Sequence, residues 1–279
     1  IKEEVRDKKL VTVCEEAKCP NISTCWNTAT ATFMVLGDTC TRACRFCNIK
    51  TGNPAGLLDK DEPRRVARSC QVMKLKYVVL TMVDRDDLPD GGADHVSQVV
   101  QSIHEKNPGI RVEVLSGDWA GSLSSLEKVL EVKMSVFAHN LETVRRLTPR
   151  VRDRRAGYDS SLRILREAKQ LSKHSLFTKS ALMLGLGETF DEVKEALVDL
   201  RENHVDMVTV GQYMRPSKKH LSIKDWVLPE VFQKIEEYAK EIGFLAVASG
   251  PLIRSSYKAD QYYEIAQRNF LGPPQKKVC

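Results

Sequence analysis

The stretch Phe33-Met-Val-Leu-Gly-Asp-Thr-Cys40-Thr-Arg-Ala-Cys44-Arg-Phe-Cys47 joins an apolar run to three closely spaced cysteines. The apolar run 33–37 predicts a short buried strand that ends at a glycine. The cysteines follow at C-x3-C-x2-C spacing, with a phenylalanine immediately before the last one. Thiolates at such intervals bind one soft metal centre from a single loop, as in iron–sulfur clusters. The stretch therefore predicts a strand that leads into a cluster-binding loop.

A second triplet, Cys14, Cys19 and Cys25, has C-x4-C-x5-C spacing, so that six of the eight cysteines lie within residues 14–47. Each triplet supplies one ligand fewer than a four-iron cluster takes, which leaves one iron per cluster for a distant residue or a ligand. A structural zinc site usually takes four Cys or His ligands in two short pairs, and neither triplet has that form. Disulfides are the other alternative, but a chain of this size does not need them to fold. The two triplets favour two [4Fe–4S] clusters.

These motifs resemble those of the lipoyl synthases, a family of radical S-adenosylmethionine (SAM) enzymes. The C-x3-C-x2-C loop is similar to the radical SAM signature, and the flanks of both triplets resemble the lipoyl synthase pattern. Similar segments recur along almost the whole chain, at residues 81–95, 139–144, 179–189, 211–220 and 250–259. The sequence departs from the family at 116–119, Ser-Gly-Asp-Trp, where a proline-containing stretch is usual. The resemblance therefore does not extend to that loop.

The resemblance implies a catalytic role for the first cluster. Cys40, Cys44 and Cys47 would hold a cluster with one open iron, which binds SAM and supplies the electron that splits it. The resulting 5′-deoxyadenosyl radical would remove hydrogen from an unactivated carbon. Because hard chemistry of this kind belongs to the cofactor, no acid–base pair is expected.

The resemblance also implies a source of sulfur. Cys14, Cys19 and Cys25 would hold an auxiliary cluster that gives up sulfide, with Ser256 of the motif Arg254-Ser-Ser-Tyr as its fourth ligand. Arg254 would supply positive charge beside an anionic cluster. The implied reaction inserts two sulfurs, at C6 and C8, into an octanoyl group amide-linked to a carrier-protein lysine, with two SAM molecules per lipoyl group. Without the resemblance, the two serines would be interpreted as a turn or a helix cap.

Apolar runs and helical segments alternate after the first strand. Five further runs predict strands at 77–81, 110–115, 134–138, 178–184 and 206–211. Helical periodicity lies between them, at 63–75, 94–106, 122–131, 141–147, 159–172 and 189–203. Alternation of this kind predicts parallel pairing through right-handed crossovers. It fits an α/β fold, a partial (β/α)6 TIM-like barrel of the radical SAM type, whose N- and C-terminal extensions would cover the mouth.

The expected parts of the chain follow from this alternation. Residues 1–32 would form an N-terminal extension with the auxiliary cysteines, 33–243 the barrel, and 244–279 a C-terminal segment with the Arg-Ser-Ser-Tyr motif. A seventh helix at 229–242 and an apolar run at 244–248 would close the chain.

Polar residues follow the predicted strands at one end of the barrel, where such folds carry their sites. Asn140 and Glu142 are candidates for the ribose hydroxyls of SAM, because an amide and a carboxylate both accept from O–H donors. Thr81 is a candidate for the methionyl end. The structural alternatives are helix capping for Asn140 and placement in a first helical turn for Glu142. His139 fits a packing role and a pocket-lining role equally well.

Two charged runs are explained without a role in catalysis. Residues 84–87, Asp-Arg-Asp-Asp, predict an ion-pair network within their loop. Arg152, Arg154 and Arg155 predict a solvated loop, with a carboxylate-rich partner as the functional alternative.

Composition and charge bound the remaining possibilities. Hydrophobic content of 42% and charged content of 29% are ordinary for a globular protein, and the net charge of +6 is mild. No apolar run approaches the roughly 20 residues of a membrane span. With no visible leader, we expect a cytoplasmic protein, or an organelle-matrix protein if a transit peptide was removed upstream of Ile1.

The expected partners are octanoylated carrier proteins, namely the glycine cleavage H protein or E2 lipoyl domains. A reductant such as ferredoxin or flavodoxin and an iron–sulfur carrier for rebuilding the cluster are also expected, but no nucleic acid or membrane. One alternative is another sulfur-inserting radical SAM enzyme, such as a methylthiotransferase, although no residues are left over for its usual extra domain. The other is an electron-carrying or structural iron–sulfur protein, which would not need polar residues at six strand ends.

Overall fold

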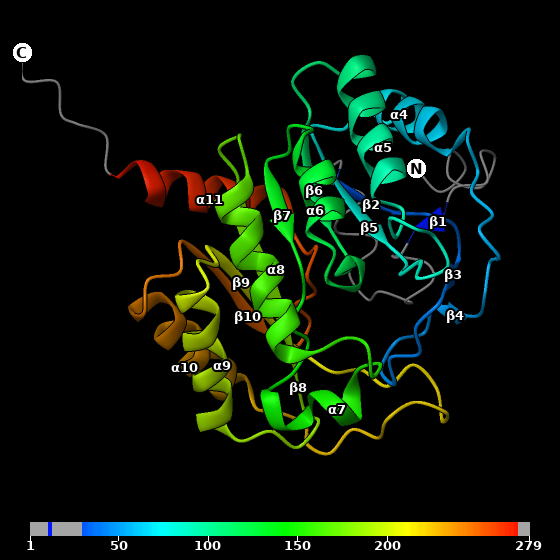
Figure 1. Cartoon of the computed structure of the whole chain (residues 1–279). Coiled ribbons are helices and arrows are strands. Elements are labelled where there is room, and N and C mark those ends of the chain that lie inside the picture. Colours follow the sequence, from blue (N-terminus) through cyan, green and yellow to red (C-terminus); the bar gives the residue numbers. More distant parts are fainter. Residues whose placement is uncertain (1–10, 13–29, 273–279) are drawn as a thin grey trace, which may run out of the picture.

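One eight-stranded sheet organises the part of the chain that the computed structural model describes, residues 11–12 and 30–272 (Figure 1). Its strand order is β1-β2-β5-β6-β7-β8-β9-β10. The strands are β1 (Val11–Thr12), β2 (Thr30–Val35), β5 (Tyr77–Met82), β6 (Arg111–Leu115), β7 (Val136–Ala138), β8 (Phe177–Leu184), β9 (Met207–Gln212) and β10 (Ala246–Gly250). Neighbours from β2 to β10 pair in parallel, whereas β1 is antiparallel to β2. All six predicted strands are present, and β10 adds a seventh parallel strand.

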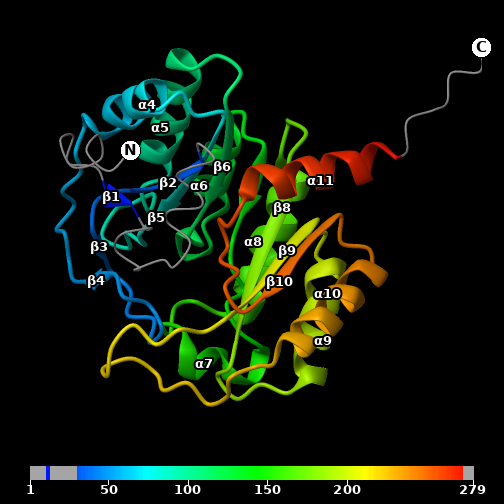
Figure 2. The ribbon, with the colours of Figure 1, turned by 180° about the vertical axis from the view of Figure 1, so that it is seen from behind.

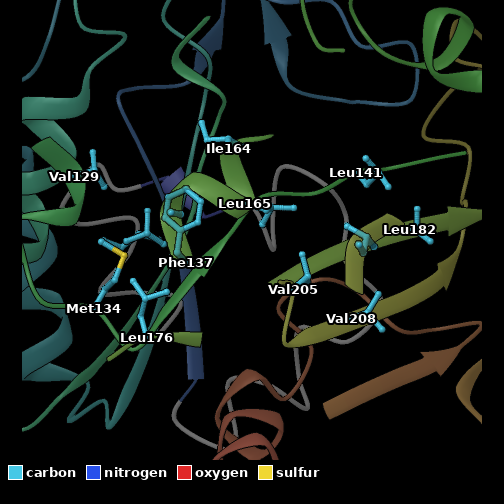
Figure 3. Close-up of a cluster of buried hydrophobic side chains, with 14 of the residues drawn as sticks. Val129, Met134, Phe137, Leu141, Ile164, Leu165, Leu176, Leu182, Val205 and Val208 are labelled. Atoms are coloured by element: carbon cyan, nitrogen blue, oxygen red, sulfur yellow. The ribbon is translucent and has the colours of Figure 1, made fainter. Parts of the chain in front are cut away.

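Helices between the strands cover the outer face of the sheet. They are α4 (Glu62–Val72), α5 (Ala93–Lys106), α6 (Leu123–Leu130), α8 (Tyr158–Leu171), α9 (Phe190–Glu202) and α10 (Pro229–Glu241). A capping box of Thr189 and Glu192 starts α9, because each residue satisfies a backbone N–H of the other. Strand and helix side chains form a continuous core, and Figure 3 shows part of it, with Phe137 of β7, Leu165 of α8 and Leu182 of β8. Burial of this apolar surface holds the crossovers against the sheet.

The last helix, α11 (Ala259–Leu271), packs on the opposite, inner face of the sheet (Figure 2). Its Tyr263 ring lies 6.0 Å from that of Tyr77 and 5.6 Å from that of Phe177. These two partners are the first residues of β5 and β8, so α11 covers the amino ends of the strands. The inner face is therefore left available for a site at the carboxyl ends.

The arrangement confirms the predicted α/β fold and its partial barrel, since β1 and β10 stand at opposite edges of the described sheet. The helix predicted over 141–147 is wrong. Glu142 has a left-handed backbone (φ 71°), and its N–H and C=O bond to Ala181 and Met183 of β8. Helical structure starts only with η2 (Arg145–Leu147) and α7 (Thr148–Val151). The backbone pairing of Glu142 with β8 takes the place of a first helical turn. The proposed boundaries at 32 and 243 stay a prediction.

In the described ranges, no helix combines the length and the apolar character needed to cross a bilayer.

Candidate active site

The three cysteines of the C-x3-C-x2-C motif lie on a closed loop at the carboxyl end of β2. Two short strands, β3 (Thr39–Cys40) and β4 (Lys50–Thr51), pair in parallel and close its base. Inside the loop, the N–H of Cys47 donates to the carbonyl of Cys44 at 3.1 Å, forming a turn. The pairing therefore keeps the three thiols on one compact loop.

Each of these thiols accepts a hydrogen bond from the backbone. The N–H of Arg42 lies 3.4 Å from Sγ of Cys40, and the N–H of Asp153 lies 3.3 Å from Sγ of Cys44. The backbone of Ile49 bonds to Cys47 in the same way. Such bonds stabilise the thiolate form, and N–H bonds to sulfur tune iron–sulfur clusters.

The donor set fits a cluster better than a single ion. Cys40, Cys44 and Cys47 are half-buried and free of disulfides. Within the described ranges, no three Cys, His, Asp or Glu side chains converge closely enough for one metal ion. A polynuclear cluster fits this spacing because each of its irons takes its own thiolate.

Burial acts on the acidity of the thiols. It raises the pKa of Cys44 to about 11 and that of Cys47 to about 12, and it also raises the pKa of Cys40. The free thiols are therefore protonated at neutral pH, so that metal binding has to release protons.

Loops that follow three other strands anchor the cysteine loop. The N–H of Thr41 donates to Asp84 O after β5, and that of Arg45 donates to Val151 O after β7, both at 2.9 Å. After β9, a ring nitrogen of His220 lies 2.9 Å from Cys47 O. The position of the thiols thus depends on contacts that are distant in sequence.

Arg42, within the cysteine loop, is bound by three carboxylates. Its guanidinium donates to Asp118 at 2.6 Å and to Asp86 at 2.9 and 3.1 Å, and it lies 3.6 Å from Asp84. Burial raises the pKa of Asp118, but the hydrogen bond and charge of Arg42 outweigh this effect, and the pKa lies below its ordinary value. For Asp84 burial dominates and raises the pKa to about 6. Nothing in the sequence singled out Arg42 except its position between two cysteines.

The predicted network within 84–87 is only half present. Arg85 does bind Asp87, at 2.8 Å, and also donates to the carbonyls of Leu36 and Leu57. Asp84 and Asp86 instead turn toward Arg42 of the cysteine loop.

The predicted solvated loop is wrong for Arg152. Its side chain is buried and donates to Ser161 Oγ at 2.6 Å. Arg155 pairs with Asp153 and Asp86, and Arg154 is exposed as expected.

The thiols open onto a cavity of about 260 Å³, which Thr81, Asn140 and Glu142 also line. The Asn140 side chain bonds to the Glu142 carboxyl group, and the left-handed backbone of Glu142 holds this pair at the end of β8. Burial raises the pKa of Glu142, although Arg152 and Asn140 oppose the shift. A polar pair that can accept from hydroxyl donors thus stands on the cavity wall with the thiols.

His139 combines its two proposed roles. It lines the same cavity, and its two ring nitrogens lie 2.9 Å from Ser116 O and from Ser161 Oγ. Burial, together with the charge of Arg152, lowers its pKa to about 4. The ring is therefore neutral at physiological pH and held in a fixed orientation.

A second cavity of about 290 Å³ adjoins the first and shares Cys47, Asn140 and Glu142 with it. Its other wall includes Arg254 and Ser256. The C-terminal segment reaches this wall because β9 carries Gly211 there: a Cβ at that position would lie 2.2 Å from the carbonyl oxygen of Ile253. Folding therefore gathers the predicted site residues of the described part around two adjoining cavities. They are Cys40, Cys44, Cys47, Thr81, Asn140, Glu142, Arg254 and Ser256.

Comparison with known proteins decides the family. The model of the radical SAM superfamily matches residues 34–200. Over 257 residues the chain is 57% identical to the lipoyl synthase of Pyrobaculum arsenaticum, covering 91% of this chain and 86% of that protein. The chain belongs to the lipoyl synthase family. The Thermus thermophilus lipoyl synthase is 53% identical over 96% of this chain and 83% of its own length. The mitochondrial lipoyl synthase of Caenorhabditis elegans is 52% identical over 94% of this chain and 75% of its own length.

A solved structure supports the fold of this lipoyl synthase family member. Methylornithine synthase matches with a TM-score of 0.62 at 16% identity, over 89% of this chain and 73% of its own. Family membership confirms the predicted radical SAM sulfurtransferase, with SAM and two [4Fe–4S] clusters as cofactors and a lipoyl carrier protein as substrate. Cys14, Cys19 and Cys25 lie outside the described residues, so the auxiliary ligand set stays a prediction.

Proposed function

We propose that Cys40, Cys44 and Cys47 hold the cluster that binds SAM, and that the cavity beside them receives SAM. When bound, this cluster supplies the electron for the reductive cleavage of SAM. The observation that carries the proposal is the group of three half-buried thiols, each bonded by a backbone N–H, on the wall of a cavity.

The chain's own polar groups would orient SAM in this cavity. Asn140 and Glu142 would accept from the ribose hydroxyls, and Thr81 would contact the methionyl end. The neutral His139 ring and the buried Arg152 would fix the wall beneath them. Burial of the site would exclude water from the reacting carbon.

We further propose that residues 1–32 bring Cys14, Cys19 and Cys25 to the second cavity, where Ser256 completes an auxiliary cluster beside Arg254. The support is that the Arg254-Ser-Ser-Tyr257 motif borders a cavity sharing Cys47 and Glu142 with the first. A weakly held serine oxygen could leave when sulfide is removed, whereas three thiolates would retain the remaining irons.

The particular carrier, the reductant, the iron–sulfur carrier and the location are part of the same proposal. The octanoyl group would arrive on the glycine cleavage H protein or an E2 lipoyl domain, with ferredoxin or flavodoxin as reductant and an iron–sulfur carrier to rebuild the cluster. The cytoplasm is the proposed location, or an organelle matrix, given that relatives include an apicoplast protein of Toxoplasma gondii and a mitochondrial one of Caenorhabditis elegans.

Iron content and product analysis test these assignments. Cys40→Ala should abolish SAM cleavage, whereas Cys14→Ala should lose one cluster's iron, keep some 5′-deoxyadenosine formation and stop sulfur insertion. Cys70→Ala, in the buried core of α4, is the matched control that should keep both clusters. Loss of all iron in Cys14→Ala would show one shared site and contradict the two-cluster assignment.

Ser256→Ala tests the fourth ligand, with Ser255→Ala as its control. Ser256→Ala should retain nearly all iron yet lose most sulfur insertion into an octanoylated carrier, measured by mass spectrometry. If Ser255→Ala behaves in the same way, the ligand has been assigned wrongly.

A further inference from the structure

Exposed cations gather in and beside the cysteine loop, on the segments that follow three strands. We call this set the basic rim, and it consists of Arg45, Arg150, Arg154, Arg215, Lys218 and Lys219. In the described part of the chain, none of the six forms an ion pair; some exposed cations elsewhere do, such as Lys240 with Glu236, and others, such as Lys76 and Lys133, do not. A surface of like charges without counter-charges is unfavourable by itself and complements an acidic partner.

Hydrogen bonds join the three loops of the basic rim into one surface. Arg45 donates its N–H to Val151 O at 2.9 Å and its guanidinium to Arg150 O at 3.4 Å. The N–H of Leu221 donates to Arg45 O at 3.2 Å. Arg215 bonds to the carbonyls of Lys218 and His220, at 2.5 and 3.0 Å, which fixes the third loop. The backbones of these three parts of the chain therefore keep their places relative to the cysteine loop.

The basic rim also borders the cavities. Arg45 stands between two lining residues, Cys44 and Phe46. Arg215 stands between the lining residues Met214 and Pro216, and Arg154 precedes the lining Ala156 by two residues. Part of the basic rim therefore stands on the same stretches of chain as the cavity walls.

We infer that the basic rim is the docking surface for the carrier protein, and that the carrier presents an acidic surface next to its octanoylated lysine. This inference rests on the proposed function. The octanoyl group is attached to a lysine side chain, which is too short to hold the carrier body away from the cavity edge. The carrier surface around that lysine must then lie against residues that border the cavities, and on this side they are basic. Complementary charge would speed encounter and orient the lysine toward the thiols.

Charge reversal tests the docking surface without touching the cluster ligands. The rim variant carries Arg150→Glu, Arg154→Glu, Lys218→Glu and Lys219→Glu. The control variant carries Lys76→Glu, Lys106→Glu, Lys133→Glu and Lys173→Glu, four exposed positions outside the site at the other end of the sheet. Both variants receive the same number of reversed charges, so a general effect of net charge would appear in both.

Two probes separate docking from catalysis: octanoylated H protein, and a short octanoyl-lysine peptide without acidic residues. The rim variant should bind the H protein with a Kd at least about tenfold higher than wild type, and this Kd should depend less on salt concentration. Conversion of the peptide by the rim variant should stay within about twofold of wild type. For the control variant, both the Kd for the H protein and the conversion of the peptide should stay within about twofold of wild type.

Each other outcome has a distinct meaning. An unchanged Kd for the H protein, or an equal loss with the control variant, would overturn the docking surface. Equal loss with the peptide would also overturn it, because the substitutions would then act on the site. If the rim variant loses RNA binding but keeps the carrier's Kd, the surface serves nucleic acid and the inference is wrong. Failure of wild-type enzyme to convert either probe would contradict the proposed function instead.

Discussion

Arg42→Ala should destabilise the protein strongly, because Arg42 is the only described cation bound to Asp118. Both side chains are 2% exposed and lie 2.6 Å apart. Asp86 and Asp84 share the same guanidinium, with side-chain exposures of 20% and 23%. Removing the arginine leaves the fully buried Asp118 and the partly buried Asp84 without their counter-charge, whereas Asp86 keeps its contact with Arg155 at 3.1 Å.

The expected cost follows from this burial. Removing one partner of a buried pair typically costs about 3–5 kcal/mol. Asp84 and Asp86 are partly exposed to water and Asp86 keeps Arg155, so we expect about 3 kcal/mol, a large share of the 5–15 kcal/mol usual for whole domains. Arg42→Lys should lie between wild type and Arg42→Ala, because an ammonium cannot reproduce the forked contact to two carboxylates.

Urea unfolding of cluster-free, reduced protein, followed by circular dichroism, measures this cost. The control is Arg65→Ala, which removes an ion pair with Asp59 at 2.8 Å. The Arg65 and Asp59 side chains are 26% and 54% exposed, so at most about 1 kcal/mol of the free energy of unfolding should be lost. Reconstituted Arg42→Ala should also hold less iron on the C-x3-C-x2-C loop, since that loop has lost its anchor. Unfolding free energies for Arg42→Ala and Arg65→Ala that agree within about 1 kcal/mol would refute the reasoning.

Three further predictions concern the inner face. Because burial lowers the pKa of His139 from 6.5 to about 4, the unfolded state binds more protons between these values, and stability should fall by up to about 3 kcal/mol as pH drops through this window. His139→Gln should flatten that part of the urea-unfolding pH profile, and an unchanged slope would count against a buried neutral ring. Lys179→Met should cost about 3–5 kcal/mol, because the buried Glu113, 2.7 Å from Lys179, would lose its counter-charge and keep only the hydrogen bond from Tyr77. Adding Glu113→Gln should restore most of the loss in the same unfolding assay. Gly211→Ala should reduce sulfur insertion at least about tenfold while SAM cleavage persists, because its Cβ displaces the C-terminal backbone. Gly250→Ala, whose Cβ would make an ordinary 3.5 Å contact, is its control, and equal loss in both would remove the explanation.

The local pattern of apolar and capping residues was enough to predict most of the strands and helix starts. Runs rich in apolar residues located all six predicted strands, because strands covered on both faces bury most of their side chains. The capping box at Thr189 marked a helix start, because its two hydrogen bonds are local. The helix predicted over 141–147 failed because the periodicity of that segment says nothing about β8, with which Glu142 pairs.

The sequence by itself determined the thiol motif, the order of strands and helices and the family resemblance, since these depend on residue type and short-range spacing. Only the tertiary structure decided that Arg42 binds Asp86 and Asp118, which lie 44 and 76 residues further along the chain. It also decided that the Arg254-Ser-Ser-Tyr257 motif borders the cavity beside Cys47. These contacts join residues far apart in sequence, and parallel strands bring them together because all their carboxyl ends meet at one edge of the sheet.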